Sequence, residues 1–288
     1  MSTAVAALLP DGRLHLQHGP IDLIVGAVGD ADEVRLAYAQ IRAAFDGVLE
    51  GLVAELAVLR APVGAKRSYA EGPIARRMIE AVWPHRAVFV TPMAAVAGAV
   101  ADEMLRAMLE GRRLQRAYVN DGGDIAIHLA PGQMMRVGVA GTLEADDRQS
   151  AALDGFTAIP FASPVRGIAT SGRGGRSLSR GIADSVTVLA ATAAAADAAA
   201  TLIANAVDVD SPAIRRLPAN AVKDDSDLGD IKVTVAVGAL AEDEIDAALD
   251  RGSVEARRMR DAGLIHGALL QLRGRQHIVS DRRSLEAA

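Results

Sequence analysis

The feature that most constrains the fold of this chain is an alanine-rich segment placed directly after a β-branched one. Residues Ala183 to Ala190 (ADSVTVLA) are nearly all apolar and rich in β-branched side chains, which is typical of a buried strand. Residues Thr192 to Val207 are mostly alanine, the best helix former, and Thr192 is a suitable N-cap. The sequence therefore predicts a strand followed at once by a helix.

The predicted helix carries one polar stripe. Asp197, Thr201 and Asn205 are spaced i, i+4 and i+8 and line one face. A carboxylate and a hydroxyl one turn apart are hard oxygen ligands, of the type that Mg²⁺ takes while keeping waters and substrate phosphates as its other ligands. A stripe that simply faces solvent has the same spacing and, for a single Asp on a helix, is the commoner case. The spacing alone leaves both interpretations open.

A glycine-rich basic turn precedes the predicted strand. The segment Thr170 to Arg176 (TSGRGGR) offers hydroxyls, guanidinium groups and three glycines, whose missing Cβ atoms let backbone N–H groups approach a ligand. An anion would suit this turn, and a solvated loop explains it equally well. No Gly-Lys-Ser/Thr follows, and the next element is a strand rather than a helix, so the pattern is neither a P-loop nor a Rossmann turn.

Composition excludes several classes of function. The chain has 288 residues and no cysteine, which excludes disulfides, Cys-ligated metals and thiol nucleophiles. Its net charge of −5 argues against nucleic-acid or membrane-surface binding. The six histidines are scattered without metal-ligand spacing. We find no targeting signal or apolar run long enough to span a membrane, and we expect a cytoplasmic protein.

The remaining periodicities predict an α+β fold, because strands and helices alternate without regular βαβ units. A Pro- and Asp-containing connection is expected over 208–230, a charged loop over 144–154, and a polar tail after 272. Strands are expected at 14–16, 21–28, 116–120, 125–129, 134–140, 156–161, 166–170, 231–237 and 264–272, and helices over 30–59 (broken near Gly47 or Gly51), 73–82, 91–110 (capped by Thr91) and 242–262.

Two further segments combine small residues with carboxylates. The helix predicted after Thr91 begins TPMAAVAGAVAD, so its start can lie close against another backbone or a flat ligand, and Asp102 is the exception in that small apolar face. The segment Asp121-Gly122-Gly123-Asp124 lies between two predicted strands and indicates a tight hairpin.

Five short motifs follow one another along the chain: Ala97-Gly98-x-x-x-Asp102, Asn120-x-Gly122-Gly123-Asp124-Ile125, Thr170-Ser171-Gly172, Ser185-Val186-Thr187-Val188 and Ala196-Asp197-x-x-x-Thr201. Motifs of this kind in this order resemble the ApbE superfamily, whose members are Mg²⁺-dependent FAD:protein FMN transferases. The residues within and around the motifs look closest to an uncharacterised bacterial and archaeal branch of that superfamily.

The resemblance implies a single domain over 1–288 with a two-lobed, T-fold-related α+β architecture, in which antiparallel sheets and flanking helices surround a cleft. It implies FAD or a related flavin or pterin-like ligand, with Mg²⁺ held by Asp197 and Thr201. The cofactor-binding positions that it implies are Gly98, Asn120, Gly122, Gly123, Asp124, Thr170, Ser171, Gly172 and Arg173.

The sequence also departs from the transferases. They have His-x-x-Asp-Pro-x-Thr-Gly between the Thr-Ser-Gly motif and the following strand, where this chain has only Arg176 to Ala183, and they have a Lys where this chain has Ala97. Phosphoryl transfer needs a metal and usually a base, so we expect flavin binding without efficient FMN transfer. Two alternatives are an enzyme acting on a pterin-like or other small anionic substrate, and a non-catalytic interaction protein. A homo-oligomer is compatible with all three.

Overall fold

The computed structural model describes residues 4–139, 155–175 and 177–280. Within them the chain forms two compact units: unit 1 is drawn from 1–136, 158–169 and 190–198, and unit 2 from 137–157, 170–189 and 199–288. The chain passes from one unit to the other inside β6 (Met134–Val139), β7 (Gly155–Pro160), β8 (Gly167–Ser171), β9 (Ser185–Ala190) and α6 (Ala193–Ala206). The expected charged loop at 144–154 lies outside the described residues.

Unit 1 is built on an antiparallel sheet with strand order β1-β2-β3-β4-β5-β8. Alternate side chains of β3, such as Leu23 and Val25, are fully buried, as expected for strands with one face toward a core. The strands are β1 (Val5–Leu8), β2 (Leu14–His18), β3 (Ile21–Gly29), β4 (Leu114–Asp121), β5 (Asp124–Leu129) and the first part of β8.

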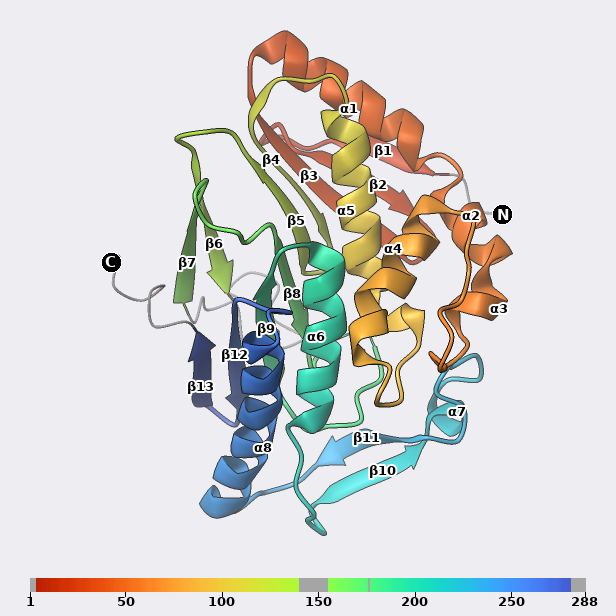
Figure 1. Ribbon diagram of the computed structural model, residues 1–288, viewed down its shortest axis with the longest axis vertical. Coiled ribbons are helices and arrows are strands. Elements are labelled where there is room, and N and C mark those ends of the chain that lie inside the picture. Colours follow the sequence, from red (N-terminus) through yellow and green to blue (C-terminus); the bar gives the residue numbers. More distant parts are fainter. Residues whose placement is uncertain (1–3, 140–154, 176, 281–288) are drawn as a thin grey trace. The chain divides into compact units, whose positions relative to one another are not determined.

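Helices cover one face of this sheet, and α5 (Val96–Leu109) lies against it, in contact with β4, β5, α1 and α4 (Figure 1). Small and apolar side chains let α5 bury most of its surface, including Ala99, Val100 and Met104. The other helices of unit 1 are α1 (Ala31–Phe45), α2 (Val48–Ala54), α3 (Leu56–Leu59), α4 (Pro73–Val82) and the 3₁₀ turns η1 (Trp83–His85) and η2 (Pro92–Ala95).

Unit 2 contains an antiparallel sheet of β9, β12 and β13, with α8 packed on β12 and β13 (Figure 1). All side chains of β9 except Leu189 are buried, so the predicted buried strand is confirmed. The elements are β9 (Ser185–Ala190), β10 (Ile214–Pro218), α7 (Ala219–Val222), β11 (Lys232–Val237), α8 (Glu242–Asp261), β12 (Gly267–Leu272) and β13 (Arg275–Ser280). The described parts of β6 (Met134–Val139) and β7 (Gly155–Pro160) form a separate pair.

The α+β class with antiparallel sheets and flanking helices is confirmed, and three local expectations are wrong. The expected connection over 208–230 contains β10 and α7, and β10 pairs with β11. The expected polar tail forms β13, which pairs with β12. Both strands carry several charged or polar residues, since each has an exposed face, and this masks their alternation. The third error concerns the start of α5 and is explained with the site.

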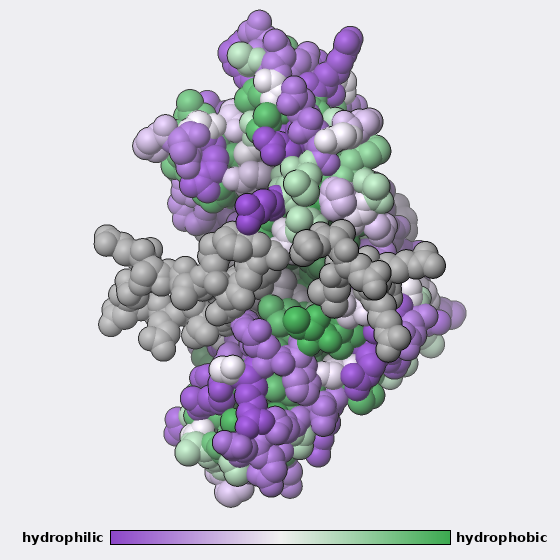
Figure 2. Space-filling view, turned by 90° about the vertical axis from the view of Figure 1, so that its left-hand side faces the viewer, coloured by the Kyte–Doolittle hydropathy of each residue, from purple (hydrophilic) through white to green (hydrophobic). Residues whose placement is uncertain are grey.

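The distribution of hydrophobic residues between core and surface is the ordinary one. Half the residues are hydrophobic, and many of them fill the cores of the units. The face shown in Figure 2 is mainly hydrophilic, with hydrophobic residues interspersed. None of the described helices combines the length and the apolar character needed to span a bilayer.

Candidate functional site

The candidate site in unit 1 begins where α5 and α6 cross with almost no side chain between them. A Cβ atom placed on Gly98 would lie 2.3 Å from the carbonyl oxygen of Ala193, far inside contact distance. Any side chain at position 98 would therefore push the two helices apart. The predicted close approach of this small-residue helix start to another backbone is thus observed, and the partner is α6.

Each of the two helices caps the other with a carboxylate. On α5, Asp102 accepts N–H bonds from Ala193 (3.0 Å) and Ala194 (2.9 Å) at the start of α6. On α6, Asp197 accepts the N–H of Gly98 (3.1 Å) in the first turn of α5. These N–H groups are among the donors that a helix start leaves without partners, so the two aspartates satisfy them reciprocally.

This arrangement corrects the expected start of the helix after Thr91. That residue makes no side-chain cap hydrogen bond, residues Pro92–Ala95 form a 3₁₀ turn, and the α-helix begins only at Val96. Its cap comes from Asp197, a residue 99 positions away in the sequence. By contrast, α6 is capped by the residue that directly precedes it, because the hydroxyl of Thr192 accepts the N–H of Ala195 at 3.2 Å.

The turn between β4 and β5 also lies in unit 1. Asp121 and Asp124 face each other across a two-residue hairpin in which Gly122 (φ 63°) and Gly123 (φ 116°) adopt positive φ. These angles suit glycine. Asn120 holds the turn, because its side-chain oxygen accepts the N–H of Gly123 at 2.8 Å. The tight hairpin that the sequence predicts is confirmed.

Charged groups of both the hairpin and the helix crossing act on the carboxyl group of Asp197. The pKa of its carboxyl group is raised to about 7, mainly by burial; the nearby charges of Asp121 and Asp102 also raise the pKa, whereas the hydrogen bonds from Gly98 and Ala97 lower it. The side chain is nevertheless partly accessible. Asp197 is therefore not the fully solvated residue of the alternative interpretation.

Burial also raises the pKa of Asp102, and the two backbone N–H groups whose hydrogen bonds it accepts and the charge of Arg77 oppose that increase. No arginine or lysine is among the main influences on Asp197. Asp197 therefore lacks the opposing cation that Asp102 has in Arg77.

The metal expectation can be compared with these positions. Asp197 and Thr201 lie one turn apart on α6, and Thr201 is partly buried. The third member of the stripe, Asn205, is already engaged, because its side-chain oxygen accepts the N–H of Arg180 at 2.9 Å. Within the described stretches, no three His, Cys, Asp or Glu side chains group as a complete metal site. A metal here would take most of its ligands from water or substrate.

The glycine-rich turn belongs to unit 2, where it is tied to the start of β9. A Cβ atom on Gly172 would lie 2.5 Å from the carbonyl oxygen of Asp184, so the turn passes directly over that residue. Arg173 donates its backbone N–H to Ala183 (2.8 Å) and its guanidinium to Asp184 (2.9 Å). The hydroxyls of Thr170 and Thr187 share a hydrogen bond of 2.9 Å. Ser171 is partly buried.

Three residues around these motifs escaped the sequence prediction of site positions. Asp121 directly precedes the two glycines of the hairpin, which was an available signal. Asp184 directly precedes the Ser185–Ala190 strand and holds Arg173, and its other oxygen accepts the N–H of Arg273 at 2.6 Å. Arg273 lies in the β12–β13 turn with φ of 50° and has no motif around it. Its role depends entirely on tertiary structure.

The fold and the site define an α+β protein with a carboxylate cluster at a helix crossing in one unit and a basic glycine-rich turn in the other. A family model described as AbpE bacteria matches residues 6–278. The chain belongs to this family.

Relatives and solved structures are more distant. The chain is 39% identical over 139 residues to a UPF0280 protein of Methanothermobacter thermautotrophicus (48% of this chain, 50% of the relative) and 40% identical over 124 residues to one of Methanopyrus kandleri (43% and 46%). The chain thus spans about half the length of the curated relatives it matches. Two solved structures are similar in outline. One is the flavinyl transferase ApbE of Pseudomonas stutzeri in its apo form (12% identity, TM-score 0.46, 99% of this chain, 97% of that chain), and the other is the flavin transferase ApbE of Vibrio cholerae (11%, 0.44, 97%, 98%).

Proposed function

We propose that this protein binds a flavin nucleotide together with Mg²⁺, with Asp197 and Thr201 as the protein ligands of the metal. Membership of the family supports the flavin nucleotide. The observation that carries the metal is the desolvated carboxylate of Asp197, whose pKa lies near 7 beside two further aspartates. Holding it ionised costs free energy unless a cation neutralises it.

Asp197 and Thr201 fit a Mg²⁺ ion that takes most of its ligands from substrate and water. This ion is commonly bound by one or two protein oxygens, with waters and substrate phosphates completing its shell. Asp197 supplies one carboxylate oxygen and Thr201 a hydroxyl. The second carboxylate oxygen of Asp197 accepts the N–H of Gly98 in α5. When bound, the metal would neutralise phosphate charge. The protein's own contribution is a rigid helix crossing that holds Asp197 in place.

The glycine-rich turn supplies positive charge for a phosphate group through Arg173. Arg173 is partly exposed, and one of its guanidinium nitrogens donates to Asp184. Its other N–H donors therefore remain for a phosphate. Asp184 fixes the position of that guanidinium and offsets part of the local positive charge. In this proposal Thr170, Ser171 and Gly172 line the same anion site.

Efficient FMN transfer is not part of this proposal. No histidine occurs between His128 and His266, so the loop after the glycine-rich turn lacks the candidate base. Arginine cannot serve as a base near neutral pH. General acid–base help typically contributes about 10²- to 10⁴-fold to a rate. Binding without efficient transfer is therefore the function that these residues support.

The ligand can be identified from the purified protein. Denaturation should release a molecule with a flavin spectrum, and titration of the stripped protein with FAD should show affinity that depends on Mg²⁺ and falls with EDTA. Asp197→Asn should remove the Mg²⁺ dependence, with Asp208→Asn as a control at an aspartate outside the proposed site. A pterin-like near-UV spectrum would point to the alternative enzyme, and no thermal shift with any nucleotide would point to an interaction protein.

Transfer has its own assay. Incubation with FAD, Mg²⁺ and an ApbE-type acceptor peptide, followed by mass spectrometry, should show no more than a slow appearance of the FMN mass increment. Rapid modification would show that another group, such as Ser177 or Ser179, replaces the missing base. That result would contradict the absence of transfer while leaving flavin binding intact.

A further inference from the structure

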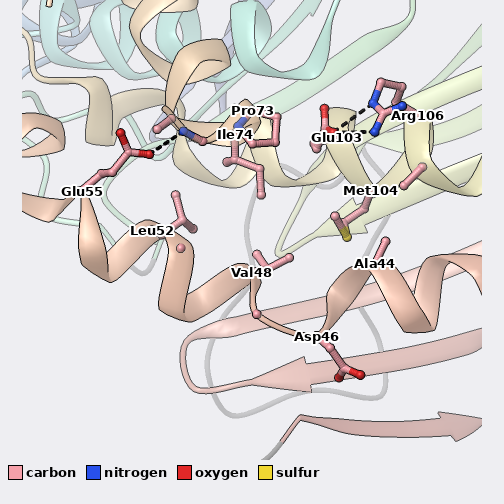
Figure 3. A pocket seen from close by; sticks show the side chains of 15 residues that line it. Ala44, Asp46, Val48, Leu52, Glu55, Pro73, Ile74, Glu103, Met104 and Arg106 are labelled. Carbon is pink, nitrogen blue, oxygen red and sulfur yellow. Dashed lines mark hydrogen bonds and ion pairs between the residues drawn. The ribbon is translucent and has the colours of Figure 1, made fainter. Parts of the chain in front are cut away.

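A cavity in unit 1 lies away from Asp197, at the other half of α5. It has a volume of about 300 Å³ and is lined by the end of α1, by α2, by the start of α4 and by α5. Figure 3 shows Val48, Ile74 and Met104 pointing toward a common space, with Asp46 directed away from them. None of the residues assigned to flavin or Mg²⁺ lines this cavity.

The cavity is preformed, because its walls are tied to one another. Glu55, which follows α2, accepts the N–H groups of Glu71 (2.7 Å) and Gly72 (2.8 Å) at the start of α4. Glu103 on α5 accepts Arg77 of α4 at 2.8 Å and Arg106 at 2.9 Å. These bonds hold α2, α4 and α5 at fixed positions without a ligand, as in most small-molecule sites.

The glycines of the wall leave the space unobstructed. Gly47 has φ of 83°, and a Cβ on Gly72 would lie 2.7 Å from the carboxylate of Glu55, so backbone and packing account for both. Gly51 lies inside α2, where glycine is a poor helix former; it is exposed, and a Cβ there would meet nothing within 4 Å. The cavity is therefore open to solvent beside Gly51.

The polar groups of the wall indicate the chemical class of the occupant. Both oxygens of Glu55 and both oxygens of Glu103 are engaged, and Arg106 is bound to Glu103 and Glu110. An ion placed against these groups would find no uncommitted charged side chain among them. Of the other lining residues, Asp46 is directed away, three are glycines, and the rest are apolar: Ala44, Val48, Leu52, Pro73, Ile74, Ala75, Met104 and Ala107.

We propose that this cavity is a binding site for a small neutral ring compound of about two fused rings. The size follows from volume, since an apolar cavity of about 150 Å³ holds one benzene ring and this cavity is about twice as large. Indole and naphthalene have the required size and polarity. The site is independent of the proposed flavin function.

The test uses indole as the probe and the full chain as the protein. Indole should bind saturably in titration calorimetry and raise the Tm, and FAD should not displace it. Indole-3-carboxylate should bind at least tenfold more weakly. Absence of indole binding, tighter binding of the carboxylate, or displacement by FAD would each overturn the proposal.

A pair of neighbouring residues on α1 provides a matched control. Ala44 lines the cavity, whereas Ala43 is exposed and does not line it. Ala44→Leu should weaken indole binding at least tenfold by filling the space, and Ala43→Leu should leave it unchanged. Gly51→Leu, which adds a side chain to the lining from α2, should act like Ala44→Leu. Equal binding by all three variants would show that indole binds elsewhere.

Discussion

The two halves of α5 hold buried carboxylates in opposite ways. In its second half, Glu103 lies between the guanidinium groups of Arg77 and Arg106. Burial acts to raise the pKa of Glu103, but the two arginines outweigh it and the pKa lies below its usual value. At the first turn of α5, the carboxylate of Asp197 faces backbone N–H groups and other aspartates, and its pKa is raised to about 7.

The difference separates a structural carboxylate from one available for binding. Glu103 carries its own counter-charges, so its ionised form is already stabilised by the fold. The fold gives Asp197 hydrogen bonds but no cation among the main influences on its pKa, so the carboxyl group is either protonated or needs a bound metal to stay ionised. Breaking either arrangement should therefore affect stability in a way that depends on pH.

The largest expected effect comes from the helix crossing that positions Asp197. Gly98→Ala should lower the free energy of unfolding by about 3 kcal/mol, because the new Cβ would lie 2.3 Å from the backbone of Ala193. Urea unfolding measures the change. Gly51→Ala is the control, since its Cβ meets open space and should raise stability by roughly 0.5–1 kcal/mol. Equal effects of the two substitutions would mean that the helices do not cross so closely.

The next effect is the pH dependence caused by Asp197. Its folded pKa is raised above the ordinary value of 3.8, so between these values the folded state holds a proton that the unfolded state lacks, and stability falls as pH rises. Without metal, the wild type should lose about 2–3 kcal/mol between pH 5 and pH 8 relative to Asp197→Asn. Unfolding in EDTA at both pH values measures this. Parallel curves for the two proteins would place the carboxylate in solvent.

Magnesium sharpens the same experiment. If the ion binds at Asp197, then Mg²⁺ should restore part of the stability of the wild type at pH 8 and none of that of Asp197→Asn.

The smallest effect comes from Glu103, and it has the opposite sign with pH. Glu103→Gln should cost about 1–2 kcal/mol at pH 7, because it removes the negative charge and one of the two acceptor oxygens that bind Arg77 and Arg106, while both arginines retain access to water. The pKa of Glu103 is lowered from 4.5, so the contribution of its charge is present above that value and is lost as pH falls through the folded pKa. A difference that persisted in acid would show that packing, rather than charge, is lost.

Local patterns carried much of the fold. The strand Ser185–Ala190, the helix after Thr192 and the helix Pro73–Val82 appear where β-branching, alanine content and an N-terminal proline predict them. The strands Ile214–Pro218 and Arg275–Ser280 were missed, because each includes exposed charged or polar positions and is recognisable only from its pairing partner.

The candidate site was predictable to a similar degree. The order of motifs identified the family, and the Gly-Gly pair identified the hairpin, since positive φ at two successive residues suits glycine. The sequence did not reveal which carboxylates are neutralised. Glu103 has Arg106 three residues further along its helix, but its second partner, Arg77, lies 26 residues away in the sequence, and no cation is a main influence on Asp197.

Residues close together along the chain were enough to predict the helices and most strands, the hairpin turn, the absence of cysteine chemistry and the family. Three features became visible only in the folded chain: Asp197 caps α5, Asp102 caps α6, and α2, α4 and α5 line a cavity. Hydrogen-bond satisfaction and desolvation depend on groups brought together from distant positions, as when Asp102 accepts the N–H of Ala193, 91 residues away.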